Sequence, residues 1–402
     1  MPDQSAVQAL AAELPELDPP LAIEPPLAID PPLAIETDEQ PPLWRHRRTK
    51  RLEHYLQADF LHWWAGESTL PRLLASDPAG TPLANVGVGP ATRTAYGDQT
   101  VGDFGHPGIR LRFGRFVPRS RVSRLEMDLW YLFERSDDFS STSLDSSLLL
   151  SRPFFNAQTG ANDSQIIRFP GVADGEFSSQ YTRQLAGFDP SVSFCLGSDA
   201  CSWWECSTGY RFLWLQDELE LNERVFLPAG GLIAPGTGFD VRDRFTANNY
   251  FHLWRFGLSH VQNRGRWLVS LRGNIGFGLV HHVVRIRGQT DSLINNTVVG
   301  TDDAGFLALQ TNRGKHERAE FGWVPDVELG LKRRLTDNLT AHAGYTLLWL
   351  PDVVKAADHV PTTIDPRNLP IEQPGAGPEP TFAYHTDDIL VHGLNFGVRY
   401  DW

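Results

Sequence analysis

The chain of 402 residues lacks any run of about 18 apolar residues, so its sequence predicts no transmembrane helix. This lack does not exclude a membrane protein, because the strands of a membrane-spanning barrel alternate apolar and polar residues and leave the mean hydropathy near that of a soluble chain. Lysine is also scarce, and 32 of the 36 basic residues are arginine, whose planar fork suits pairing with carboxylates. Charged residues at 21% and aromatic residues at 11% are typical of a folded chain.

Motifs of the common enzyme classes are absent as well. The sequence has no H-E-x-x-H, G-x-S-x-G or Walker loop, and no basic face that would favour nucleic acid. We therefore expect neither enzymatic activity nor a cofactor; a hydrolase would need a nucleophile, a base and an orienting group at one strand end, and no such set is found. No signal peptide is visible, because Met1 leads into P-D-Q-S and the next apolar stretch is short and lacks a basic flank.

The N-terminal segment differs in composition from the rest of the chain. Residues 1–43 contain nine acidic residues and no lysine or arginine, which accounts for most of the net charge of −13. Residues 19–36 are three copies of P-P-L-A-I-E/D, and paired prolines favour extended polyproline II. We predict that residues 1–50 form a disordered acidic spacer, with a ligand for a partner domain as the alternative, and that residues 51–402 form the folded domain.

The stretch 265–287 carries the main structural signal. Its alternate residues Trp267, Val269, Leu271, Ile275, Phe277 and Leu279 are apolar, whereas Ser270, Arg272, Asn274, Gly276 and Gly278 between them are polar or small. Side chains alternate across a strand, so this pattern predicts one apolar and one polar face. It runs for about a dozen residues, the length of a tilted membrane-spanning strand rather than of an ordinary one. The expectation is a transmembrane barrel with lipid outside and a polar lumen.

Similar patterns recur along the chain and predict an all-β antiparallel transmembrane barrel of ten to fourteen strands. The candidate strands are 54–64, 109–116, 122–134, 177–194, 206–221, 249–260, 265–287, 319–332, 339–350 and 389–402. Long and short links alternate strictly between them, as in outer-membrane barrels with short periplasmic turns and long outer loops. The long links leave room for further strands, because 147–155 and 165–169 are apolar enough for a hairpin. We interpret F-D-V-R-D-R-F at 239–245 as a loop salt-bridge network at the barrel mouth.

Several stretches resemble a lineage-restricted family of bacterial β-barrel porins, the seventh family so named. They include Y-L-Q-A-D-F-L-H-W-W from residue 55, S-R-P-F-F-N at 151–156, G-R-W-L-V-S-L-R-G-N-I-G-F-G at 265–278, V-P-D-V-E-L-G-L at 324–331 and G-L-N-F-G-V-R-Y at 393–400. The resemblance covers about residues 51–402 and implies a porin-type barrel in the bacterial outer membrane. The last strand, with Phe396, Val398, Tyr400 and Trp402 in alternation, resembles the C-terminal strand that outer-membrane assembly machinery recognises.

Two local sets of residues are candidate sites. Charged residues on the polar faces cannot point into lipid, where each would cost about 2–4 kcal/mol at mid-depth. We expect these residues to line the lumen: Asp59, Arg110, Arg112, Glu126, Asp128, Arg211, Arg255, Arg272, Asp326, Glu328 and Arg399. Cys195, Cys201 and Cys206 flank a predicted turn, where two could form a disulfide in an oxidising periplasm or all could stay thiols, and we expect no metal.

The lumen leaves two functions open, and we predict the first, a porin that gives ions or small solutes passive passage, with a closed barrel as the alternative. In a wide barrel the lumen charges would line a passive path for ions or small solutes. In a narrow barrel they would pair and fill the interior, and the protein would be a structural or surface-interaction protein of the cell envelope. The expected partners are outer-membrane lipid, the assembly machinery and small solutes or ions, without nucleic acid, and the sequence leaves the oligomeric state open.

Overall fold

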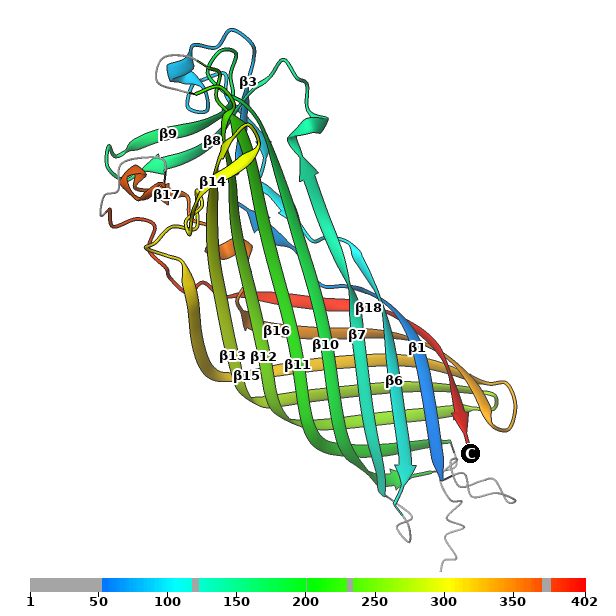
Figure 1. The fold of residues 1–402 in the computed structure, drawn as a ribbon. Helices are drawn as coiled ribbons and strands as arrows, with labels where there is room; N and C mark the ends of the chain where they lie inside the picture. Colours follow the sequence, from blue (N-terminus) through cyan, green and yellow to red (C-terminus); the bar gives the residue numbers. More distant parts are fainter. Residues whose placement is uncertain (1–52, 118–122, 200, 230–233, 371–376) are drawn as a thin grey trace, which may run out of the picture. The chain divides into compact units, whose positions relative to one another are not determined.

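A computed structural model of the chain describes residues 53–117, 123–199, 201–229, 234–370 and 377–402 (Figure 1). The predicted acidic spacer, residues 1–50, therefore lies outside the described residues. Regular structure in the described part consists of β-strands and four short 3-10 turns: η3 (Leu83–Asn85), η4 (Ser141–Ser143), η5 (Ala357–His359) and η6 (Pro366–Asn368). No helix in that part has the length and apolarity needed to cross a membrane.

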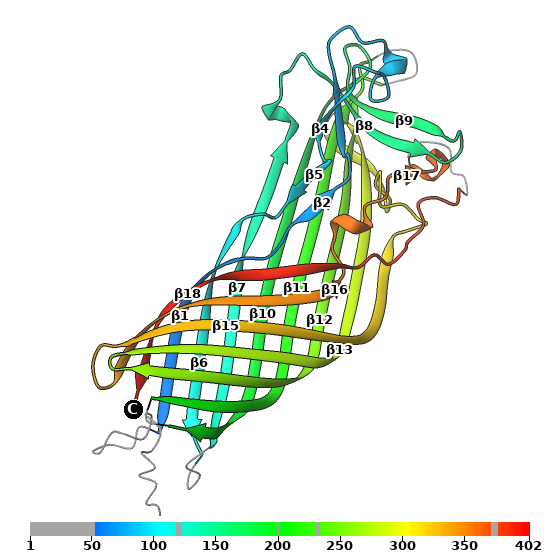
Figure 2. The same ribbon diagram turned by 180° about the vertical axis from the view of Figure 1, so that it is seen from behind.

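Ten antiparallel strands close into a ring, each hydrogen-bonded to its neighbour along the chain (Figures 1 and 2). They are β1 (His54–Trp64), β6 (Gly105–Phe116), β7 (Ser123–Ser140), β10 (Asp174–Ser198), β11 (Ser202–Phe226), β12 (Thr237–Arg264), β13 (Trp267–Ile294), β15 (Gly314–Arg334), β16 (Leu339–Val353) and β18 (Asp387–Asp401). The pairing of β1 with β18 joins the two ends of the described chain and closes the barrel. The predicted all-β antiparallel barrel is confirmed, and each candidate strand overlaps one of these ten.

The ring strands present apolar side chains on the outside and polar side chains on the inside, the reverse of a soluble protein. On β7 the apolar Leu125, Met127 and Leu129 are 45–49% exposed, whereas Glu126 and Asp128 between them are at most 9% exposed. The alternation places every second side chain outside, where lipid tails accept apolar groups and exclude charge. The same apolar-out pattern on the other ring strands produces an apolar outer band.

Four strands, β10 to β13, are 25–28 residues long and continue past the ring, whereas β1, β16 and β18 have 11–15 residues. In this extension the hydrophobic alternation reverses its phase. On β12 the outward residues change from Trp254 and Phe256 to Arg244 and Arg242, while the inward residues change from Arg255 to Phe245. An outward face beyond the lipid meets water and is therefore polar, and the inner face packs against loops.

The phase reversal corrects the interpretation of residues 222–248 as a long loop. Strand β11 ends only at Phe226, and β12 begins at Thr237, so F-D-V-R-D-R-F lies in a strand. Asp243 points to the buried face, while Arg242 and Arg244 point outward to the carboxylates of β11. Lipid requires apolar outward residues only within the membrane, so this pattern does not predict the part of a strand that extends beyond the membrane.

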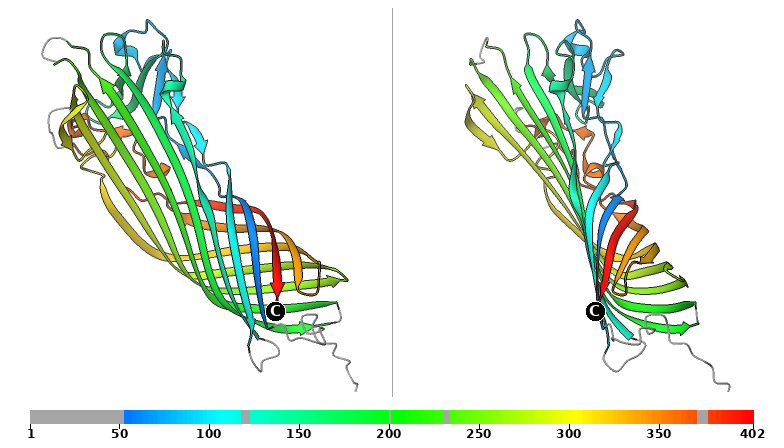
Figure 3. Two further views of the ribbon diagram at one scale, coloured as in Figure 1. Left: turned by 45° about the vertical axis from the view of Figure 1, so that its right-hand side comes forward. Right: turned by 90° about the vertical axis from the view of Figure 1, so that its right-hand side faces the viewer.

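Eight short strands in the long links complete the secondary structure: β2 (Ser68–Leu70), β3 (Leu74–Asp77), β4 (Arg93–Tyr96), β5 (Gln99–Val101), β8 (Leu149–Asn156), β9 (Ala161–Arg168), β14 (Thr297–Asp302) and β17 (Thr363–Ile364). Strands β8 and β9 form the hairpin predicted within its link. These strands gather at the end of the barrel opposite the C-terminus (Figure 3). That end is the outer one, because outer-membrane barrels carry their long loops there.

Candidate functional site: the barrel interior and its outer cover

The lumen of the ring holds a layer of paired charges. Arg211 of β11 donates from Nε to Asp189 Oδ1 at 2.9 Å and from Nη2 to Asp189 Oδ2 at 3.0 Å, and it also pairs with Asp326 of β15. Arg112 of β6 pairs with Asp128 at 2.7 Å and with Glu328 at 3.0 Å. Since these groups come from strands on different sides of the ring, the network spans the lumen.

The eleven residues expected to line the lumen are buried or half-buried. Ten of them join ion pairs with one another, with Asp189 or with His342: Asp59, Arg110, Arg112, Glu126, Asp128, Arg211, Arg255, Arg272, Asp326 and Glu328. Arg272 lies 4.0 Å from Glu126, and Arg399 pairs with Asp401 at the short-turn end. Their role in a solute path stays a proposal, because most of these charges neutralise one another.

Two members of the network were not expected from the sequence. The first is Asp189 of β10. Its inward neighbours are the small residues Gly187 and Ser191, so the inward and outward faces of this strand differ little in polarity in the sequence. The second is His342 of β16, whose Nδ1 lies 3.3 Å from Asp59 and 3.2 Å from Gln57. The available signal was the period-two face alone, which does not indicate which residues meet across the ring.

Inward glycines make room for the large side chains. A Cβ added to Gly114 would lie 2.0 Å from the ring of Tyr55, and one added to Gly187 would lie 2.2 Å from the ring of Trp130. Large residues on one strand thus cover glycines on the next, an arrangement by which small barrels fill their interior. The cavity left among the charges at mid-lumen has a volume of only about 30 Å³.

An apolar layer lies above the charges, toward the outer end. It comprises Leu61, Trp63, Trp130, Leu132, Leu185, Leu213, Leu215, Phe251, Leu253, Val280, Val324, Leu348, Leu350, Ile389 and Val391. Each is at most 4% exposed, and together they come from every ring strand except β6. Within this layer Trp63 points inward, packs 5.1 Å from Trp130 between ring centroids and donates from Nε1 to Asn395. Buried apolar side chains from nine strands therefore meet at this level of the lumen.

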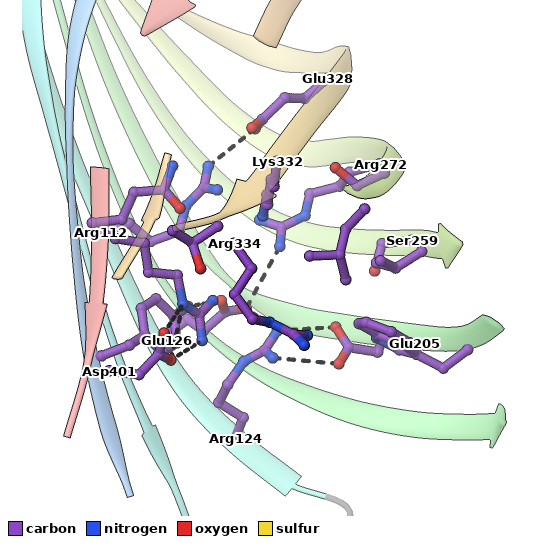
Figure 4. Close-up of a pocket in the computed structure, with 18 of the residues that line it drawn as sticks. Arg112, Arg124, Glu126, Glu205, Ser259, Arg272, Glu328, Lys332, Arg334 and Asp401 are labelled. Atoms are coloured by element: carbon purple, nitrogen blue, oxygen red, sulfur yellow. Dashed lines mark hydrogen bonds and ion pairs between the residues drawn. The ribbon is translucent and has the colours of Figure 1, made fainter. Parts of the chain in front are cut away.

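The short-turn end of the lumen keeps a cavity of about 170 Å³. Figure 4 shows Arg124 of β7 donating to Glu205 of β11 on one side and Lys332 of β15 approaching Arg272 of β13 on the other. Within the described chain, no carboxylate lies within 4.0 Å of the Lys332 ammonium. Its lining includes Arg112, Arg272 and Glu328, so the cavity reaches from the short-turn end up to the charged layer.

Buried polar groups hold the long links over the outer end of the lumen. Arg183 of β10 pairs with Asp217 at 2.6 Å and donates from Nη1 to the carbonyl oxygens of Ala65 and Gly66 at 2.6 and 2.9 Å. Asn249 of β12 exchanges two 2.9 Å hydrogen bonds with the backbone of Val354. Each contact fixes one link to the inner wall of the β10–β13 extension.

A second pair of links is held by Arg152 of β8. Its guanidinium lies 3.3 Å from Glu223 and 3.4 Å from Asp243, and it stacks 4.3 Å from the ring of Phe306. Asp243 Oδ1 accepts from the backbone N–H groups of Leu307 and Ala308 at 3.0 and 2.9 Å. Burial raises the pKa of Glu223, while the nearby Arg152 opposes that shift. The cover is therefore a packed structure with its own core.

The cysteines do not form the disulfide considered from the sequence. Cys195 is the Cα partner of Glu205, whereas Cys206 is the partner of Phe194, so the two lie one register step apart and face opposite sides of the sheet. Cβ vectors that point apart cannot be bridged without moving the backbone. In the described chain no disulfide joins Cys195, Cys201 and Cys206, and no group of three histidine, cysteine or acidic residues could hold a metal ion.

Comparisons with known proteins give one family and several distant structures. Residues 55–402 match the family described as "Putative beta barrel porin-7 (BBP7)". No curated protein matches the chain. Similar solved structures include the outer membrane protease OmpT from Escherichia coli, with 8% identity over 87% of this chain and 97% of that chain and a TM-score of 0.39. A FadL homologue from Pseudomonas aeruginosa shares 7% identity over 87% and 90% of the two chains, with a TM-score of 0.26.

A third structure is an anion-selective porin from Comamonas acidovorans, with 10% identity over 86% of this chain and all of that chain and a TM-score of 0.16. At these TM-scores the likenesses carry no activity over to this protein. The family match spans nearly the whole described barrel and agrees with the resemblance found in the sequence. The chain therefore belongs to this family of β-barrel porins, and it is a protein of the bacterial outer membrane.

Proposed function

We propose that the protein is a closed outer-membrane barrel that serves as a non-enzymatic structural or surface-interaction component of the cell envelope. The observation that carries this proposal is the apolar layer across the lumen, in which no side chain is more than 4% exposed. A constriction lined by apolar groups repels water and hence hydrated ions. The charged layer below it adds a second closure, because its groups neutralise one another.

The packed outer cover supports the surface-interaction part of the proposal. Links that only guard a channel need little internal order, whereas these links share a buried core with the β10–β13 extension. Arg152, Arg183 and Asn249 fix them by hydrogen bonds and ion pairs in the protein interior. Rigid loops on a rigid scaffold are a common way to present a binding surface.

Passive passage of ions or small solutes is the competing function, and the family description favours it. The pocket of about 170 Å³ at the short-turn end would then be the periplasmic vestibule of a path that opens by movement of the apolar layer. Its mixed charges would give little preference between cations and anions.

Conductance of the purified full chain in planar lipid bilayers separates the two functions. We expect folded, inserted protein to give no stepwise openings in several salts. A double variant, Trp63→Ala with Trp130→Ala, removes the two largest rings of the apolar layer and should introduce openings. Trp204→Ala, which changes an exposed tryptophan on the outer surface, is the matched control and should stay silent. Stepwise openings of the unmodified protein would establish the porin function instead.

We also propose that the C-terminal strand is the signal for the barrel assembly machinery. Phe396, Val398 and Tyr400 on the outward face of β18 and Trp402 directly after this strand are 45–50% exposed, where a partner could contact them before the barrel closes. Replacing Trp402 with serine should slow insertion by reconstituted assembly machinery while leaving spontaneous folding into thin bilayers unchanged. Equal slowing of both processes would indicate a purely structural role.

A further inference from the structure

A cluster of cations lies on the outward face of the sheet, just beyond the apolar band at the outer end. It consists of Arg242 and Arg244 of β12, Arg285 and Arg287 of β13, and Lys315 of β15, and we name it the outer basic patch. Arg242, Arg244 and Lys315 have side chains that are 58%, 41% and 49% exposed, and Arg285 and Arg287 are exposed as well. The patch is thus open to whatever surrounds the barrel at that height.

The strand register places like charges opposite one another within the patch. Arg244 is the Cα partner of Arg287, and Arg285 is the partner of Lys315. Like charges directly opposite across an antiparallel pair destabilise a sheet. Folding alone therefore does not favour this arrangement, and an anion bound from outside would relieve the repulsion.

Nearby carboxylates neutralise only part of the patch. Glu220 and Glu218 of β11 pair with Arg242 and Arg244, and Glu317 pairs with Lys315 at 2.5 Å. Among the described residues, no carboxylate lies within 4.0 Å of Arg285 or Arg287. Two adjacent guanidinium groups on one strand thus keep their charge and their donors free for an external group.

The height of the patch relative to lipid follows from the strand geometry. Tyr250 and His281 face each other across β12 and β13, with ring centroids 6.2 Å apart, and mark the outer margin of the apolar band. Arg285 lies four residues beyond His281, or about 13 Å along the strand and about 10 Å along the membrane normal at a tilt of about 40°. A headgroup layer about 5–8 Å thick, together with flexible arginine stems, places the guanidinium groups at the level of lipid phosphates.

We propose that the outer basic patch binds the phosphate-bearing headgroup of a lipid in the outer leaflet, with Arg285 and Arg287 as its main contacts. Guanidinium groups bind phosphate oxygens through two parallel hydrogen bonds, which ammonium groups cannot do. The basic charge at this level is confined to one part of the barrel circumference, because the outward residues at the same level of β10 are the uncharged Gln180, Thr182 and Gln184. A lipid bound there would fix the barrel to its annulus next to the strands that carry the outer cover.

The test measures binding of diphosphorylated lipid A to the full chain in a non-ionic detergent, by tryptophan fluorescence energy transfer to a labelled lipid. The double variant R285Q/R287Q removes the two uncompensated charges, and R115Q/R266Q makes the same charge change at exposed positions of the short-turn end. We expect R285Q/R287Q to bind about 25-fold more weakly, at about five-fold per charge near a lipid surface. R115Q/R266Q should bind within about two-fold of the unmodified protein.

Three outcomes would overturn the proposal. The first is equal binding by the unmodified protein and R285Q/R287Q, with both shown to be folded by heat-dependent gel mobility. The second is equal binding of phosphorylated and dephosphorylated lipid A, which would indicate acyl-chain contacts alone. The third is full competition by inorganic phosphate, which would indicate a site for the free ion. The result does not depend on conductance, so this inference and the closed-barrel proposal can fail separately.

Discussion

Replacing Arg211 should show how much the charged layer contributes to the stability of the barrel. Arg211→Met removes the group that joins Asp189 to Asp326, leaving two carboxylates with Arg255 as the nearest cation, 3.8 Å from Asp189. Removing one partner of a buried ion pair costs about 3–5 kcal/mol, because the remaining charge stays desolvated. Asn274 still donates to Asp326 at 2.6 Å and offsets part of that cost. We expect a loss of about 3 kcal/mol.

A second substitution separates the loss of the pair from the loss of a side chain. In the double variant Arg211→Met with Asp326→Asn, Asp189 keeps Arg255, and the remaining charges balance. The free energy of unfolding should then recover to within about 1 kcal/mol of the unmodified protein. Arg115→Met, at an exposed outward position of β6, is the control and should change stability by less than about 0.5 kcal/mol.

The assay is reversible urea unfolding of the protein in lipid vesicles, followed by tryptophan fluorescence. The reasoning is refuted if Arg211→Met costs less than about 1 kcal/mol, because the charged layer would then be hydrated rather than buried. It is also refuted if the double variant is as unstable as the single one. In either case the lumen would contain water at the level of Arg211, and the closed-barrel proposal would lose one of its two supports.

Two further predictions concern packing and pH. Gly114→Ala should destabilise the barrel by about 1–3 kcal/mol, because the new Cβ would lie 2.0 Å from the ring of Tyr55. The control Gly273→Ala places a Cβ with no atom within 4 Å and should leave the stability unchanged in the same urea assay. Equal effects of the two substitutions would show that the interior is loosely packed. In the outer cover, burial lowers the pKa of His359 from 6.5 to about 4, with His385, His316 and the hydrogen bond to the Lys355 carbonyl as smaller influences. The opened segment therefore binds more protons than the folded one between those values, so its stability should fall by up to about 3 kcal/mol as pH drops through that window. Proteolysis of residues 351–370 should accelerate on acidification and become less pH-dependent in His359→Gln, and an unchanged profile in that variant would contradict the assignment.

The strands and their faces could be predicted from the sequence for a simple physical reason. Lipid tails exclude charge, so each membrane-spanning strand must present apolar groups outside, as Leu125, Met127 and Leu129 do on β7. That requirement acts on every second residue and leaves a local pattern. It predicted all ten ring strands, the alternation of short and long links and the inward faces of the charged residues.

The alternation of apolar and polar residues did not predict the parts of the strands that extend beyond the lipid. On β12 the apolar residues lie on the inner face beyond Tyr250, so the sequence predicts a loop where the structure has the strand extension. Of the cysteine pairs that the sequence leaves open, the register excludes Cys195 with Cys206, because these two face opposite sides of the sheet.

What the sequence by itself determined is therefore the barrel, its membrane and the face of each residue within the membrane-spanning part of the strands, because these follow from contact between one strand and one solvent. Only the tertiary structure decided which side chains meet in the interior. Whether Arg211 meets Asp189 or water, and whether the apolar residues from nine strands meet in one layer, depends on ring closure and on the register between strands far apart in the chain. Such contacts leave no period in the sequence, because they join residues that only ring closure brings together.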